Sequence, residues 1–175
     1  LLSQQIAGYY DPREKKMVLI DAASDSGGQK VVLPIEYFTR ILVEGIGFSL
    51  EKILLSHELT HVLQDQHFNL LSLPFEELDP EDTTSAVRAL IEGDATLVMM
   101  DYILEQQGVD STQVPDISER MHIWTDSPFV RGFGLFQTVP RYIMDNLLFS
   151  YIYGFDFVLQ LKQRGGWELI NQAYA

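Results

Sequence analysis

Two short runs of strand-forming residues stand near the start of the chain. They cover residues 5–10 and 16–20, which contain many β-branched and aromatic residues, and the turn-forming sequence Asp11-Pro12-Arg13-Glu14 separates them. This pattern predicts a β-hairpin. Residues 22–29 have the composition of a loop, and Val31-Val32-Leu33 could add one short strand. The predicted sheet is therefore small.

Apolar residues at helical spacing follow. From Ser49 to about His67 there is no Pro or Gly, and apolar residues occur at positions 50, 53, 54, 55, 59 and 62. This pattern predicts a helix that has Ser49 as its N-cap and is buried on more than one side.

Turn-forming residues divide the second half of the chain into further helices. A Pro-bearing acidic loop over residues 73–82 leads to Thr83 or Thr84 as the next N-cap, and this second long helix is predicted to run to about Gln107, with Gly108 ending it. Further helices are predicted at residues 117–123, 141–163 and 167–175, and the breaks are marked by Pro128, Gly132, Gly134 and Pro140.

These elements predict an α+β fold, in which a small N-terminal β-sheet packs on a helical bundle. A chain of 175 residues with 46% hydrophobic composition is large enough for one compact domain with a single core. The chain opens directly into strand-like residues without an initiator Met. We therefore expect residues 1–175 to form a single domain that is a piece of a longer protein, which could be extracytoplasmic or membrane-anchored.

Composition and charge exclude several classes of function. A net charge of −13 with Lys and Arg scattered along the chain makes nucleic acid an unexpected partner. The most apolar late stretch, residues 143–161, contains Asp145, Asn146, Asp156 and Gln160, so it predicts a buried helix rather than a membrane span. With no Cys in the chain, His, Asp and Glu are the strong side-chain ligands that remain for a metal. No feature indicates an oligomeric state.

The sequence His57-Glu58-Leu59-Thr60-His61 is an HExxH motif on the first predicted helix. Residues four apart are separated by about 6 Å along a helix and about 40° around it, so both imidazoles project from one face and can reach one zinc ion. Glu58 would stand beside the open metal position and activate metal-bound water. A chance match to this motif somewhere in the chain has a probability of about 0.6% from residue frequencies.

A catalytic zinc needs a third protein ligand, and two residues compete for this role. His67 lies six residues after His61, as in the metzincin motif HExxHxxGxxH, but Gln64 replaces the Gly that would turn the chain out of the helix. If the helix continues, His67 lies about 240° around from His61. The other candidate is Glu92, whose neighbours on the second long helix are mostly apolar. It could instead form an ion pair with Arg88.

An HExxH motif followed on a later helix by Glu in an E-G-x-A setting resembles the gluzincin zinc peptidases, especially minimal gluzincin-like domains of a bacterial group. The resemblance extends over nearly the whole chain and includes three strings, Gly8–Pro12, His57–Phe68 and Arg88–Thr96. It implies a zincin-like fold, one Zn²⁺ ion held by His57, His61 and Glu92, and Glu58 as the general base.

One position departs from that family's pattern. Thermolysin-like gluzincins place an Asp four residues after the Glu ligand to orient a zinc-bound histidine, and this chain has Thr96 there. Asp94 or Asp65 could orient a histidine instead, and either could equally be a solvated or ion-paired carboxylate. A donor for the oxyanion is also required. The late tyrosine Tyr151 is our candidate, chosen from a set that also contains His122, Arg131, Tyr142 and Tyr153.

The function predicted from the sequence is zinc-dependent hydrolysis of a peptide bond in a peptide or protein substrate. Three alternatives remain open. The chain could be a catalytically silent zinc-binding or structural module of the same fold, it could have a metzincin-like site with His67 as the third ligand, or it could be a scaffold without metal.

Overall fold

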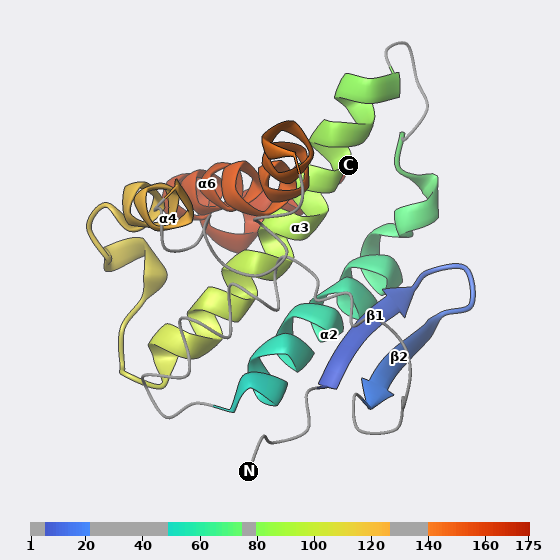
Figure 1. The fold of residues 1–175 in the computed structure, drawn as a ribbon, viewed down its shortest axis with the longest axis horizontal. Helices are drawn as coiled ribbons and strands as arrows, with labels where there is room; N and C mark the ends of the chain where they lie inside the picture. The colour runs from blue at the N-terminus through green and yellow to red at the C-terminus, as the bar shows by residue number, and fades with distance from the viewer. Residues whose placement is uncertain (1–5, 22–48, 75–79, 127–139) are drawn as a thin grey trace. The chain divides into compact units, whose positions relative to one another are not determined.

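The computed structural model describes residues 6–21, 49–74, 80–126 and 140–175. In chain order it contains β1 (Ile6–Asp11), β2 (Lys16–Asp21), α2 (Leu50–Phe68), α3 (Pro80–Glu105), α4 (Ile117–Asp126) and α6 (Arg141–Gln172), together with the short 3₁₀ helices η1 (Leu70–Ser72) and η2 (Ser111–Gln113) (Figure 1). A mostly helical chain with one small antiparallel sheet among its described residues confirms the predicted α+β class.

The chain divides into two compact units, Leu1–Ser72 and Leu73–Ala175. The zincin-like fold and the single domain over residues 1–175 remain predictions. None of the helices in the described ranges combines the length and the apolarity that a membrane crossing requires.

In the first unit, β1 and β2 form the predicted hairpin. The strands are antiparallel, with Tyr10 opposite Met17 and Asp11 opposite Lys16. The connecting turn is held by Asp11, because its Oδ1 accepts hydrogen bonds from the backbone N–H groups of Arg13 (2.9 Å) and Glu14 (3.3 Å). The short strand expected at residues 31–33 lies outside the described residues.

Helix α2 lies beside β1 in the same unit, and Asp65 connects the two elements (Figure 1). Asp65 is only 4% exposed, and its Oδ2 accepts a hydrogen bond of 2.8 Å from the Tyr10 hydroxyl. Its Oδ1 accepts a second bond, 3.0 Å long, from the backbone N–H of Leu70. Burial and then the hydrogen bond to Asp65 raise the pKa of Tyr10 above its ordinary value. Asp65 therefore ties the end of α2 to the hairpin.

Helix α2 begins and ends close to the predicted residues, but Ser49 does not cap the helix with its side chain. Ser49 occupies the N-cap position, but its side chain makes no capping hydrogen bond, and its backbone carbonyl accepts from Lys52 N (3.1 Å) and Ile53 N (3.3 Å). At the other end, Asn69 adopts a left-handed conformation (φ 51°), and its N–H donates to Asp65 O at 2.9 Å. The helix is therefore continuous from Leu50 to Phe68.

The second unit is built on the packing of α6 along α3. The two helices approach closely where Gly93 meets Gly154: an ideal Cβ placed on Gly154 would lie 2.2 Å from Ala89 O and 3.1 Å from Gly93 Cα. Both helices also contribute buried apolar side chains to the core of this unit, namely Ala95, Leu97 and Met99 from α3 and Phe155, Val158 and Ile170 from α6. The reason for Gly93, which lowers helix propensity by about 1 kcal/mol, is this close approach of two backbones.

The two helices predicted at 141–163 and 167–175 correspond to the two arms of α6. Gly165 and Gly166 have non-helical dihedral angles between the arms, and Gly166 (φ 63°) is in a region that favours glycine. After this kink the chain brings Tyr174 to α3, where its hydroxyl donates a hydrogen bond of 2.9 Å to Asp94 Oδ2. Lys162, before the kink, is also tied to α3, since its Nζ lies 2.6 Å from Asp101 Oδ2.

Two predicted boundaries in this unit are wrong by a few residues. Helix α3 begins at Pro80 rather than after Thr83 or Thr84. Proline is compatible with the first turn of a helix because it lacks an N–H that would have no partner there. Helix α4 runs on to Asp126 rather than ending near residue 123. The breaks expected at Pro128, Gly132 and Gly134 lie outside the described residues.

Replacing Gly154 with Ala is expected to destabilise the second unit by at least about 2 kcal/mol, because the new methyl group would overlap the Ala89 carbonyl and the helices would have to separate. Urea unfolding followed by circular dichroism measures this loss. Gln160→Ala, at an exposed position of the same helix, is the control and should change stability by less than about 0.5 kcal/mol. If Gly154→Ala unfolds like the parent chain, the described backbone contact is wrong.

Candidate metal centre

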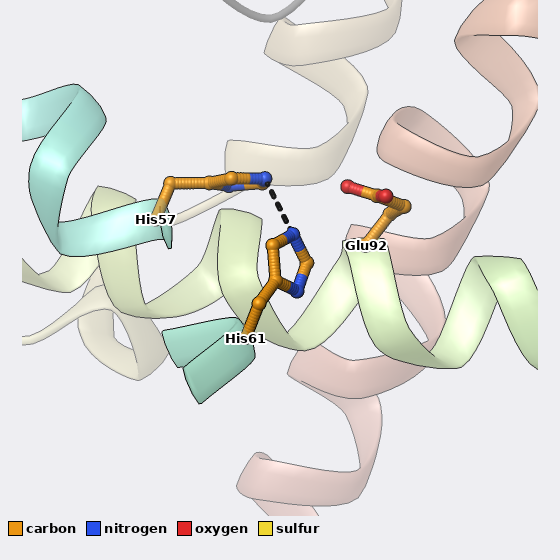
Figure 2. A group of neighbouring side chains, drawn as sticks. All are labelled: His57, His61 and Glu92. Carbon is orange, nitrogen blue, oxygen red and sulfur yellow. Dashed lines mark hydrogen bonds between the residues drawn. The ribbon is translucent and has the colours of Figure 1, made fainter. Parts of the chain in front are cut away.

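Helix α2 places His57 and His61 one turn apart, so both imidazoles leave the same face of the helix. The Nε2 atoms of the two rings are 3.2 Å apart, and the ring planes are nearly perpendicular, at 89° with the centroids separated by 4.7 Å (Figure 2). His57 is only 2% exposed. Two nitrogen atoms that can act as ligands therefore lie next to each other within one unit.

The separation of these nitrogens fits a shared zinc ion. With Zn–N bonds of about 2.0 to 2.1 Å and tetrahedral angles, two imidazole nitrogens on one ion are about 3.3 Å apart. The observed Nε2–Nε2 distance is 3.2 Å. In the structure this contact is a hydrogen bond, so one of the two Nε2 atoms carries a proton. A zinc ion would take the place of that proton and bind a lone pair of each ring at nearly the same separation.

Gln64 contacts the ring nitrogen of His61 that does not face His57, namely Nδ1. Its Oε1 lies 2.8 Å from His61 Nδ1, and Gln64 is 2% exposed. The contact spans three residues of α2, the spacing at which helical side chains are neighbours. The hydrogen bond between Gln64 and His61 was not predicted from the sequence. There, Gln64 was noted only as a departure from the Gly of the metzincin motif. The signal that could have found it is the i, i+3 spacing from His61.

Glu92 lies in α3, next to the Gly93 contact with α6, and is partly exposed. Among the described residues, the group that could hold a metal ion consists of His57, His61 and Glu92. One ligand atom from each lies within 4.8 Å of those of the other two (Figure 2). These are the three residues that the sequence analysis put forward as ligands.

His67, the competing third ligand, is not in this group. Because α2 continues past Gln64, His67 stays on the helix and is exposed, and its Nδ1 lies 2.9 Å from the carbonyl oxygen of Leu63 one turn earlier. A hydrogen bond from the Nδ1–H to that carbonyl is typical of a histidine near a helix C-terminus.

Glu58 follows His57 on α2 and is buried, with 8% of its surface exposed. Its position about 100° around the helix from His57 sets its carboxylate off the face from which the two imidazoles leave. The role of Glu58 as a general base remains a prediction.

The structure gives partners to the two aspartates expected to orient a histidine. Asp65 accepts hydrogen bonds from Tyr10 and Leu70, and buried Asp94 accepts one from Tyr174. Thr96, four residues after Glu92, is fully buried. The roles of Asp65 and Asp94 at a metal remain predictions.

The candidate donors for an oxyanion lie mainly on α6. Tyr151 is half-buried, Tyr153 is exposed and stacks on Phe149 with a centroid distance of 5.2 Å, and Tyr142 is exposed. His122, on α4, pairs with Asp156 of α6. Arg131 lies outside the described residues. The catalytic role of Tyr151 remains a prediction.

Comparison with known proteins finds no family model that matches the chain and no curated protein or solved structure that is similar to it.

Proposed function

We propose that this chain is a zinc-dependent peptidase of the gluzincin type, in which His57, His61 and Glu92 hold one zinc ion and Glu58 is the general base. The observation that carries the proposal is the group of two imidazoles and one carboxylate whose ligand atoms lie within 4.8 Å of one another. The group coincides with the ligands that the HExxH motif and its resemblance to gluzincins implied.

The donor set favours zinc over other common metals. Two neutral imidazoles and a carboxylate are a set found at catalytic zinc sites, whereas calcium and magnesium prefer sites made of oxygen atoms. Three protein ligands leave one tetrahedral position open, as a catalytic site requires. A structural zinc site would normally use four protein ligands.

The burial of Glu58 supports its role as the base. Zinc at such a site supplies Lewis-acid activation of water and of a substrate carbonyl. Glu58 would take the proton from the attacking water and pass it to the leaving amine, so that the peptide bond is hydrolysed without a covalent intermediate. Its low exposure, 8%, limits competition from bulk solvent for that proton.

The direct test measures zinc content and peptide cleavage on the same preparation of the purified chain. We expect about one zinc per chain, cleavage of an unfolded protein such as reduced casein, loss of cleavage with a chelator and recovery when zinc is added back. Absence of zinc after incubation with excess zinc salt would contradict the proposal. Bound zinc without cleavage of any peptide mixture would instead support the catalytically silent zinc module.

A further inference from the structure

The imidazole of His61 makes a hydrogen bond through each of its two ring nitrogens, one to His57 and one to Gln64. Its Nε2 faces His57 Nε2 at 3.2 Å, while its Nδ1 lies 2.8 Å from Gln64 Oε1. The two nitrogens of this ring therefore have different surroundings, and a side chain contacts each one.

We propose that Gln64 is a positioning residue for the metal centre: its side-chain oxygen keeps the proton of His61 on Nδ1 and so leaves Nε2 as the metal-binding atom. This inference rests on the proposed function. A neutral imidazole carries one proton, and the nitrogen that hydrogen-bonds to an acceptor keeps it. A carbonyl-type oxygen at 2.8 Å from Nδ1 is such an acceptor.

Burial makes this hydrogen bond effective. Gln64 is 2% exposed, so water has little access to replace it as the acceptor. Both partners belong to α2, three residues apart, so the helix itself sets their distance. The ring is thereby oriented before any ion arrives, which reduces the conformational entropy lost on binding.

A Gln suits the position where the metzincin motif has Gly for two reasons. Gly would end the helix there, whereas Gln continues it and reaches back to His61. A neutral amide polarises the imidazole less than a carboxylate would, and it adds no negative charge to a site that already contains Glu58 and Glu92.

The test compares Gln64→Met, which removes the acceptor at similar volume, with Gln64→Glu, which keeps an acceptor. Zinc affinity is measured by competition with a chromophoric chelator at pH 7.5. We expect Gln64→Met to bind zinc about 10- to 100-fold more weakly than the parent chain, and Gln64→Glu to bind it at least as tightly as the parent. Gln66→Met, at an exposed position of the same helix, is the matched control and should bind like the parent.

Nitrogen-15 NMR of histidine-labelled protein without metal supplies the second readout. We expect the His61 signals to report a proton on Nδ1 in the parent chain and in Gln64→Glu, and a mixture of tautomers in Gln64→Met. A structural role alone would not move this signature. If Gln64→Met fails to fold, the parent spectrum and Gln64→Glu still decide the question.

The possible results separate this inference from the proposed function. A proton on His61 Nε2 in the parent chain, equal zinc affinity in Gln64→Met, or equal losses in Gln64→Met and Gln64→Glu would each overturn the role of Gln64. If the parent chain binds no zinc at all, the proposed function fails, and the NMR signature alone then judges whether Gln64 holds the proton.

Discussion

Replacing Glu58 with Gln is expected to lower the rate of peptide cleavage by about 100- to 10,000-fold while the chain keeps its zinc. The amide has nearly the size of the carboxylate and a similar helix propensity, but it cannot accept a proton from water at neutral pH. Because Glu58 is not among the residues proposed as ligands, the metal should remain. The measurements are kcat on a defined peptide and zinc content of the same sample.

Glu105→Gln is the matched control for this experiment, since Glu105 is exposed and ends α3. It should leave both cleavage and zinc content unchanged. Cleavage that persists in Glu58→Gln at the parent rate would contradict the assignment of Glu58 as the base. Loss of zinc together with cleavage would mean that Glu58 takes part in binding the metal, which the proposal excludes.

Removing one ligand is expected to have the largest effect on zinc itself. His61→Ala and Glu92→Gln should each weaken zinc binding by more than about 100-fold, because even the loss of a residue that only supports a ligand costs about 10- to 100-fold. Elemental analysis after dialysis at low zinc should then find metal in the parent chain and little in either variant. At a free zinc concentration 100 times the dissociation constant, the parent chain should also gain about 2.7 kcal/mol of stability that the variants lack.

His67→Ala is the comparison that decides the third ligand. We expect this variant to keep the zinc of the parent chain, because His67 lies 2.9 Å from the Leu63 carbonyl and is outside the candidate metal group. The opposite outcome, with zinc kept in Glu92→Gln and lost in His67→Ala, would refute the gluzincin arrangement and favour the metzincin-like alternative.

The elements that could be predicted were those with a strong local pattern. The hairpin follows from two strand-like runs around Asp11-Pro12-Arg13-Glu14, and α2 from a long stretch without Pro or Gly. Boundaries were less certain because they depend on single residues. Pro80 fits the first turn of α3 although it also fits a loop, and Ser49 stands at the N-cap position without using its side chain.

The aspartates show why some roles could not be assigned from sequence. Asp65 accepts a hydrogen bond from Tyr10, 55 residues away, and Asp94 accepts one from Tyr174, 80 residues away. Neither pairing has a spacing that a periodic pattern could reveal. Gln64 is the converse case, because its partner His61 is only three residues away and the contact was within reach of the helical spacing rule.

The sequence by itself determined the HExxH helix and the meeting of its two imidazoles, because residues one turn apart on a helix are neighbours whatever surrounds them. Only the tertiary structure decided the features that depend on distant segments, such as the contact of Gly93 with Gly154 and the return of Tyr174 to Asp94. The physical reason is that helix geometry is local and periodic, whereas these contacts arise from packing and bring together residues whose separation along the chain follows no period.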